Sequence, residues 1–220
     1  MRMSRDEQVE RNRQLVLAAA RRVFLARGYA GATLDAIAEE AGFSKGVVYS
    51  QFDSKADMFL ALLEARINER AEQHDRLADA LEGHRVVRAV AELTDSLQQA
   101  EPEWGLLVIE FRAHAARVPE LSRRYAELHS RTVERLTGFF GRLYEQPGAE
   151  PRLPARTMAE FVLALGSGTV LERLAESAAL PGPVFADIVS QTVTAAAGRP
   201  GVAGLASLAG PAAAARSATS

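Results

Sequence analysis

The amino-acid sequence predicts an all-α fold of about nine helices, with a three-helix unit at the N-terminus and a larger helical domain after it. Apolar residues recur at helical spacing along most of the 220 residues. No segment shows the alternation of a half-buried strand or the turn of a hairpin. Prolines and glycines separate the periodic segments, and a chain of this length can bury a sizeable core in a two-part design.

The first helix is expected over residues 11–27. We expect Gly28 to end it, because glycine adopts at little cost the left-handed conformation that often follows a helix. One face of this helix is apolar and carries Val16, Ala19, Ala20, Val23 and Phe24. That pattern is typical of a helix packed on one side against a core.

Two short helices are expected in close succession after the first. Thr33 is placed to cap a helix that runs to about Ala41. Gly42 then permits a tight turn into a third helix, which Ser44 can cap. The sequence therefore predicts a helix-turn-helix pair close to the N-terminus.

The later helices are expected to be longer, with prolines between them. Ser54 and Asp57 have the three-residue spacing of a capping box, which predicts the start of a fourth helix. Further helical segments are expected at residues 55–81, 84–99, 103–118, 120–144, 155–178 and 184–197. Residues 198–220 are mostly Ala, Gly, Ser and Pro, a composition that predicts a flexible tail with little to bury.

Composition limits the classes of function. The chain has 48% hydrophobic and 25% charged residues and a net charge of −2, which is ordinary for a globular protein. It has no cysteine, which excludes disulfides, thiolate nucleophiles and cysteine-based metal sites. Neither an apolar run of about 18 residues nor a basic and apolar leader is present, so we expect no membrane partner and a cytoplasmic location.

Charge is distributed unevenly along the chain. Residues 1–55 hold nine Lys and Arg against seven Asp and Glu, a local charge of +2, whereas the remainder carries −4. Contact with nucleic acid depends on local charge rather than on the total. The N-terminal part is therefore the part expected to meet DNA.

Residues 32–55, ATLDAIAEEAGFSKGVVYSQFDSK, carry the strongest functional signal. Their apolar residues are spaced so that two short helices can cross, with the small Ala38 and Gly42 making room for the crossing. The second helix then projects short or polar side chains that a DNA major groove can admit. The same geometry also occurs where it only closes a three-helix core and binds no DNA.

Each outward residue type has a role available on DNA. Lys45 and Lys55 can neutralise phosphates, and the hydroxyl groups of Thr33 and Tyr49 can donate hydrogen bonds to phosphate oxygens. Gln51 can pair with adenine, Val47 can touch a thymine methyl group, and Lys45 can alternatively reach guanine.

The same stretch resembles the TetR family of repressors. A Gly-Tyr pair is followed by Thr33 and then by AIAEEAGFSKGVVYSQFDSK with an apolar continuation, and the likeness spans about residues 10–70. The resemblance implies a DNA-binding domain at 10–70 with its helix-turn-helix motif at about 33–52, and a ligand-binding and dimerisation domain at 71–197. It also implies a homodimer that represses transcription from a palindromic operator in double-stranded DNA and is released by a small-molecule ligand.

Positions that often touch DNA in the family can be carried over residue by residue. The candidate DNA-binding residues are Thr33, Ser44, Lys45, Gly46, Val47, Tyr49, Ser50, Gln51 and Lys55. This chain has Ser50 and Gln51 where relatives commonly show a second aromatic residue and then histidine. Base preference is therefore not inherited, and phosphate anchoring is the safer inheritance.

Two further sites are expected in the C-terminal part. Apolar stripes with small residues predict a dimer interface, whose candidates are Phe161, Leu165, Gly168, Thr169, Ile188 and Thr192; such stripes can equally be core within one chain. A mostly apolar cavity with a few polar groups would serve a ligand. Its candidate lining is Trp104, Leu107, Val108, Phe111, His114 and Phe139, although His114 can also be an ordinary core or surface histidine.

An enzyme is not expected. The sequence has no nucleophile elbow, no phosphate-cradling glycine loop and no evident nucleophile beside a base. Glu110 and His114 share a helix face, but a single such pair is weak support for a metal site, so neither metal nor cofactor is expected. Two alternatives stay open: an activator on the same fold, and an all-α protein-interaction module without DNA binding.

Overall fold

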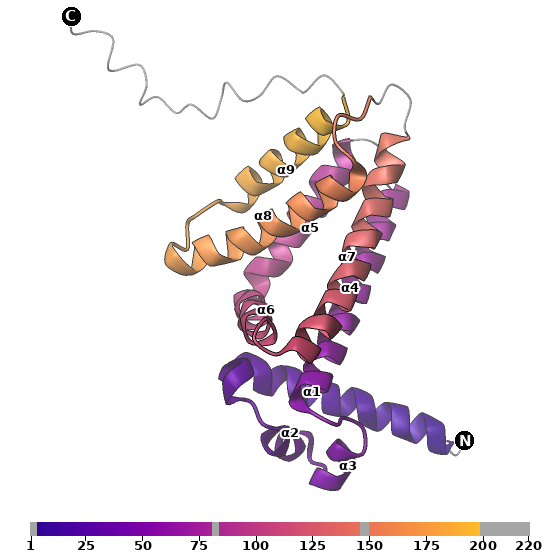
Figure 1. Cartoon of the computed structure of the whole chain (residues 1–220), viewed down its shortest axis with the longest axis vertical. Coiled ribbons are helices and arrows are strands. Elements are labelled where there is room, and N and C mark those ends of the chain that lie inside the picture. The colour runs from indigo at the N-terminus through magenta and orange to yellow at the C-terminus, as the bar shows by residue number, and fades with distance from the viewer. Residues whose placement is uncertain (1–3, 81–83, 146–149, 199–220) are drawn as a thin grey trace, which may run out of the picture.

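The structure is a computed structural model that describes residues 4–80, 84–145 and 150–198. Over these residues it has nine α-helices and no strand, which confirms the predicted all-α fold (Figure 1). The helices are α1 (Arg5–Gly31), α2 (Leu34–Ala41), α3 (Lys45–Tyr49), α4 (Lys55–Ala80), α5 (His84–Ala100), α6 (Pro102–Ala115), α7 (Pro119–Tyr144), α8 (Ala155–Ala175) and α9 (Gly182–Ala196). The tail predicted at 198–220 lies, from residue 199 on, outside the described residues.

Helix α1 begins six residues before the predicted start. Ser4 caps it: the amide of Glu7 donates to Ser4 Oγ at 3.1 Å, and the amide of Ser4 donates to Glu7 Oε2 at 2.6 Å. This reciprocal capping box stabilises a first turn that has no apolar face. Apolar periodicity therefore could not locate this end of the helix.

Gly28 bends α1 without ending it. Its backbone has φ 68° and ψ 174°, a combination that only glycine adopts freely, and helical structure continues to Gly31. The predicted left-handed glycine is present, but the helix ends later than its position suggested. The bend turns the next residues, Tyr29 among them, toward α6.

The first hydrophobic core joins the N-terminal helices to α4, α6 and α7. Aromatic rings form its centre: Phe59 lies 5.4 Å from Phe24, 5.5 Å from Tyr29 and 4.4 Å from Phe111 between ring centroids. Because Phe111 belongs to α6, the three-helix unit shares a continuous core with the rest of the chain.

The second core lies between α5, α7, α8 and α9, with α5 against α9 and α7 against α8. Figure 1 shows α4 and α7 running side by side away from α1. Ion pairs from Glu64 to Arg131 at 2.6 Å and from Asp75 to Arg142 at 3.3 Å join these two helices. None of the nine described helices is both long and apolar enough to cross a membrane.

Candidate DNA-binding surface and ligand cavity

Local signals fix the turn between α2 and α3. Thr33 Oγ1 accepts a hydrogen bond from the amide of Ala36 at 3.2 Å and so caps α2. Gly42 then adopts φ 69° and ψ 23°, and the amide of Phe43 donates to Ala38 O at 3.1 Å. This left-handed glycine closes α2 and starts the turn toward Ser44, as the sequence predicted.

Helix α3 is anchored by one residue and presents the others outward. Val48 is completely buried in the first core. Tyr49, by contrast, is 51% exposed although it is aromatic. Of the remaining candidates, Ser44, Lys45, Gly46 and Ser50 are exposed, and Val47 and Gln51 are half-buried. The structure therefore gathers these seven predicted DNA-binding residues on and beside one short helix.

The two lysines lie in different surroundings. Lys45 is exposed, and its ammonium group pairs with Asp35 of α2 at 2.6 Å. Lys55 donates from Nζ to the carbonyl oxygens of Tyr29 at 2.6 Å and Ala30 at 3.2 Å, and partial burial lowers its pKa. Lys55 thus binds the C-terminal end of α1, a contact that the sequence did not reveal.

A large cavity lies between α4, α5, α6, α7, α8 and α9. Its volume of about 1530 Å³ is larger than the roughly 300–1,000 Å³ that is usual for ligand sites. Much of its wall is apolar, including Leu63, Ile67, Val87, Val108, Phe139, Val162, Phe185 and Val189. Such a wall suits the body of a small organic molecule.

Three of the six predicted pocket residues line this cavity, namely Trp104, Val108 and Phe139. Leu107 and Phe111 lie in the first core instead, because they face α1 and α4. His114 is exposed, with its ring 5.2 Å from that of Tyr29. Successive side chains on a helix point about 100° apart, so of two residues adjacent in sequence one can line the cavity while the other lies in the core.

The sequence did not point to the basic residues of the cavity wall. Arg66, Arg70 and His74 follow one another at four-residue spacing on α4, and all three line the cavity. Residues four apart share one face of a helix. Burial, and to a smaller extent the charge of Arg70, lowers the pKa of His74. This spacing was visible in the sequence but is equally typical of a solvent-exposed face.

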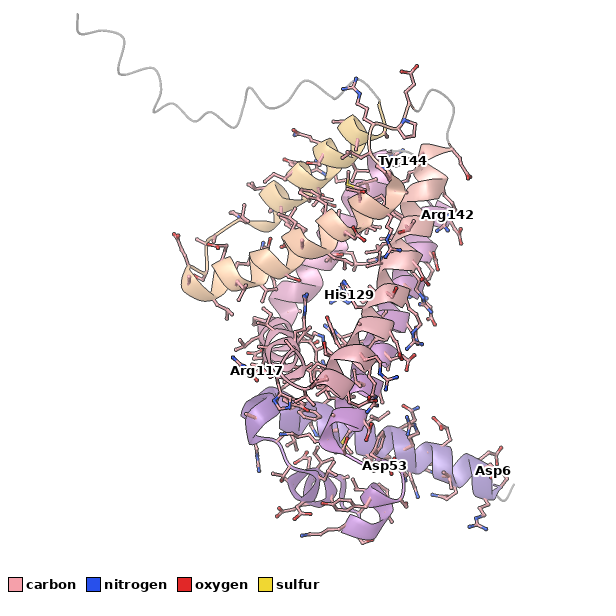
Figure 2. The ribbon with its side chains drawn as sticks, in the orientation of Figure 1. Asp6, Asp53, Arg117, His129, Arg142 and Tyr144 are labelled. Atoms are coloured by element: carbon pink, nitrogen blue, oxygen red, sulfur yellow. The ribbon has the colours of Figure 1, made fainter. Side chains whose placement is uncertain are left out.

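A smaller pocket of about 270 Å³ adjoins the large cavity, and the two share Arg112 and Val108 in their walls. His129 of α7, labelled in Figure 2, lies on its wall with its ring stacked 6.0 Å from that of Tyr125. Burial, followed by the charge of Arg112, lowers the pKa of His129. The neutral imidazole is therefore favoured in this pocket.

Two polar contacts connect the cavity region to α1. Glu101, at the start of α6, pairs with Arg21 of α1 and, at 2.8 Å, with Arg66 of α4. Burial and the neighbouring charges of Arg70 and Arg21 lower the pKa of Arg66 to about 10, so Arg66 stays protonated at neutral pH. Glu101 is itself part of the cavity wall.

The second contact lies at the bend of α1. The amide of Tyr29 donates to Glu110 Oε2 of α6 at 2.9 Å. A Cβ atom placed on Gly28 would lie 2.9 Å from the same oxygen. We expect Gly28→Ala to lower the free energy of unfolding by about 1–3 kcal/mol, because alanine is strained in this conformation and crowds the carboxylate.

Urea unfolding measures this effect against a matched control. Gly138→Ala makes the same change in α7, where an added Cβ meets no atom within 4 Å of the described residues. That substitution should raise stability by about 0.5–1 kcal/mol. Equal stability of Gly28→Ala and the wild type would contradict the strain assigned to this bend.

Helix α8 has a mostly exposed apolar row. Phe161, which is 43% exposed, is followed at helical spacing by Ala164, Gly168 and Leu171, and no atom of the described residues lies within 4 Å of a Cβ added at Gly168. Among the other predicted interface residues, Leu165, Ile188 and Thr192 are half-buried. Thr169 is 1% exposed, and its hydroxyl donates to Leu165 O at 2.9 Å. Thr169 thus lies inside the protomer and is unavailable to a partner.

Among the described residues, no group of three or more His, Asp or Glu side chains could hold a metal ion. Glu110, the predicted partner of His114 in a weak metal pair, instead accepts the hydrogen bond from the backbone of α1.

Comparison with known proteins identifies the family. Residues 16–62 match the model of bacterial regulatory proteins of the tetR family. Residues 82–198, more than half of the chain, match the model of the BetI-type transcriptional repressor C-terminal domain.

Individual relatives agree with these matches. The HTH-type regulator YfiR of Bacillus subtilis is 27% identical over 173 residues, which cover 76% of this chain and 82% of that protein. The HTH-type activator FasR of Mycolicibacterium smegmatis is 45% identical over 67 residues, which cover 30% of this chain and only 29% of that protein.

The structure of FadR from Bacillus subtilis in complex with stearoyl-CoA has the same fold. Its TM-score is 0.68 at 16% identity, over 82% of this chain and 96% of that one. The predicted family resemblance is confirmed, and the chain is a DNA-binding transcriptional regulator rather than an enzyme. It belongs to the TetR family of bacterial regulatory proteins.

Proposed function

We propose that this regulator is a repressor that binds a palindromic operator as a homodimer and leaves it when a small molecule occupies the large cavity. The observation that carries the proposal is the position of Glu101, which pairs with Arg21 of α1 and with Arg66 on the cavity wall. One carboxylate thus touches both the helix that supports the DNA-binding unit and the wall of the ligand site.

Residues 10–70 act as the DNA-binding domain, and residues 71–197 as the ligand-binding and dimerisation domain, in the cytoplasm where bacterial DNA lies. The exposed hydroxyl of Tyr49 donates to a phosphate oxygen beside the major groove. Lys45 exchanges its exposed ion pair with Asp35 for a phosphate, at small cost because exposed ion pairs contribute little to stability. Lys55 stays on the end of α1 and offers its backbone amide, near the start of α4, to the next phosphate.

Base contacts come from the middle of α3 and from the turn that follows it. Val47 and Gln51 are half-buried, and Gln51 Oε1 is buried without a hydrogen-bond partner among the described residues. No hydrogen bond from the described part of the chain holds this oxygen in place, so the side chain can turn outward to pair with a base edge, for which adenine is the best match.

Dimerisation through α8 and α9 gives the spacing that an operator requires. Two-fold symmetry places the two DNA-binding domains of the dimer on half-sites that are about 34 Å, or a multiple of that distance, apart. The row of exposed Phe161, Ala164 and Leu171 with half-buried Gly168 supports α8 as the contact helix, because a row at this spacing packs against its own copy in a symmetric pair.

Release follows from linkage between the two sites. A ligand that prefers a conformer in which the two DNA-binding domains are spaced differently weakens operator binding. The bound operator then weakens ligand binding by the same factor. The stearoyl-CoA held by FadR of Bacillus subtilis supports a small-molecule ligand on this fold. The match to a BetI-type repressor domain supports repression.

Operator binding can be tested with the purified protein and labelled DNA from around its own gene. We expect Tyr49→Ala to weaken specific binding about 10-fold or more, because a hydrogen bond to a charged phosphate is lost. Fluorescence anisotropy across a salt series measures the effect, and specific binding should fall steeply with salt.

Leu106→Ala is the matched control, because Leu106 is also an exposed large side chain, at 37%, but lies on α6. It should bind DNA like the wild type. If Tyr49→Ala binds the operator as tightly as the wild type, Tyr49 is not part of the DNA-binding surface. If the wild type shows no specific DNA binding at low salt, the protein-interaction alternative is favoured.

An activator is the second candidate. The DNA-binding part resembles FasR, whose name describes an activator, over 67 residues. Deleting the gene of this regulator and measuring transcripts of the genes beside its operator distinguishes a repressor from an activator. Loss of a repressor raises transcription, and loss of an activator lowers it.

A further inference from the structure

The cavity wall carries more positive than negative charge that is free to meet a ligand. Six arginines line it: Arg66, Arg70, Arg112, Arg135, Arg142 and Arg173. Its acidic residues are Glu72, Asp75, Glu101 and Glu134. Of these, Glu101 already holds two arginines, Asp75 pairs with Arg142, and the others are exposed to solvent. Arg112, Arg135 and Arg142 are exposed as well, so Arg66, Arg70 and Arg173 are the arginines that face inward.

The basic groups that face the cavity differ in whether an acidic side chain of the same chain pairs with them. Arg66 has Glu101, and Arg173 pairs with the buried Asp95 at 2.6 Å. Arg70 is half-buried and has no hydrogen bond or ion pair among the described residues; the adjacent Glu69 interacts with it only electrostatically. Arg70 is therefore the wall cation best placed to bind an anion.

Two cavity-lining side chains carry unpartnered polar atoms, and one of them neighbours this cation on α4. His74, one helical turn along α4, has its Nε2 atom buried without a hydrogen-bond partner among the described residues. The Nη1 atom of Arg173 is buried and unpartnered in the same sense. Buried polar atoms are normally hydrogen-bonded, so atoms left without partners on a cavity wall indicate where a ligand supplies them.

Much of the remaining wall is apolar. Val108, Phe139, Val162 and Phe185, which line it, have side chains made of carbon and hydrogen alone. The available volume of about 1530 Å³ accepts an extended apolar chain along with a charged head.

We propose that the effector is an amphipathic anion, whose acidic group binds Arg70 and His74 and whose apolar chain lies along the aliphatic and aromatic wall. This inference rests on the proposed function for the role of the molecule as an effector, but not for its binding. A guanidinium holds a carboxylate or a phosphate through charge-assisted hydrogen bonds, so either acidic group satisfies the site.

The lone tryptophan provides the measurement. Trp104 lies on the cavity wall with the Arg66 guanidinium 4.9 Å from its ring, so a molecule that enters the cavity changes its fluorescence. Titrations below the micelle concentration compare four probes with one chain length: dodecanoate, dodecyl phosphate, dodecanol and dodecyltrimethylammonium. We expect at least one anion to bind about 10-fold or more tightly than dodecanol, and the cation to bind most weakly.

Two variants test the position of the acidic group. Arg70→Gln should weaken binding of the preferred anion about 10-fold and leave dodecanol binding unchanged. Arg76→Gln removes the same charge from an exposed position of α4 that does not line the cavity, and it should bind all four probes like the wild type. A stronger response to dodecanoate than to dodecyl phosphate, or the reverse, identifies the acidic group.

The inference is overturned if dodecanol or the cation binds as tightly as both anions, if neither anion binds, or if Arg70→Gln binds the anions like the wild type. Operator affinity measured with and without the preferred anion is a separate readout. Anion binding that leaves operator affinity unchanged would retain the inferred site and contradict the proposed release mechanism.

Discussion

Glu101→Gln is expected to make operator binding insensitive to the proposed effector. In the wild type the Glu101 carboxylate holds Arg21 and Arg66 together, one from the helix behind the DNA-binding surface and one from the cavity wall. A neutral amide keeps the shape of the side chain but attracts neither guanidinium by charge. A coupling between sites is typically about 5–150-fold in affinity, and the variant should reduce it to nearly one.

The measurement is operator affinity with and without dodecanoate, by fluorescence anisotropy, with ligand binding followed separately by Trp104 fluorescence. Glu103→Gln is the control, because Glu103 is an exposed carboxylate two residues along the chain and has no ion pair among the described residues. Unchanged coupling in Glu101→Gln, with unchanged ligand binding, would show that the signal passes elsewhere, for example through Glu110 and Tyr29.

Local sequence signals predicted the DNA-binding unit well because its structure depends on neighbours in sequence. Thr33 caps α2 and Gly42 takes the left-handed conformation, each through contacts within five residues. The start of α1 was missed although its signal is equally local, because the prediction followed apolar periodicity. Its first turn depends on the polar capping box of Ser4 and Glu7, which adds no apolar residue to the periodic pattern.

The cavity could be predicted only in part, because its wall depends on how six helices pack. Val108 and Leu107 are both apolar and adjacent, yet one faces the cavity and the other the first core. Arg70 and His74 have the appearance of a solvated helix face until α5 and the later helices enclose them. Lys55 matched a DNA-binding position, but only the bend of α1 brings Tyr29 O within its reach.

Phe161→Glu is expected to convert the proposed homodimer into monomers. Phe161 is exposed at one end of the apolar row on α8, and in the proposed interface it packs against the same row of the partner. Two copies of a glutamate would bring like charges into an apolar contact without a cation to pair them, which strongly disfavours association. The protomer itself should stay folded, because this side chain is 43% exposed and not part of either core.

Loss of the dimer should also lower the affinity for DNA, because two linked DNA-binding domains bind one operator far more tightly than either domain alone. Linkage of this kind contributes about 10²–10⁴-fold, so operator affinity should fall by that order while weak binding to a half-site persists. Sedimentation equilibrium and anisotropy measure the two effects, with Leu106→Glu as the control: the same kind of change at an exposed apolar residue of α6. A Phe161→Glu protein that stays dimeric would place the interface on another face, and a monomer with full operator affinity would contradict binding as a dimer.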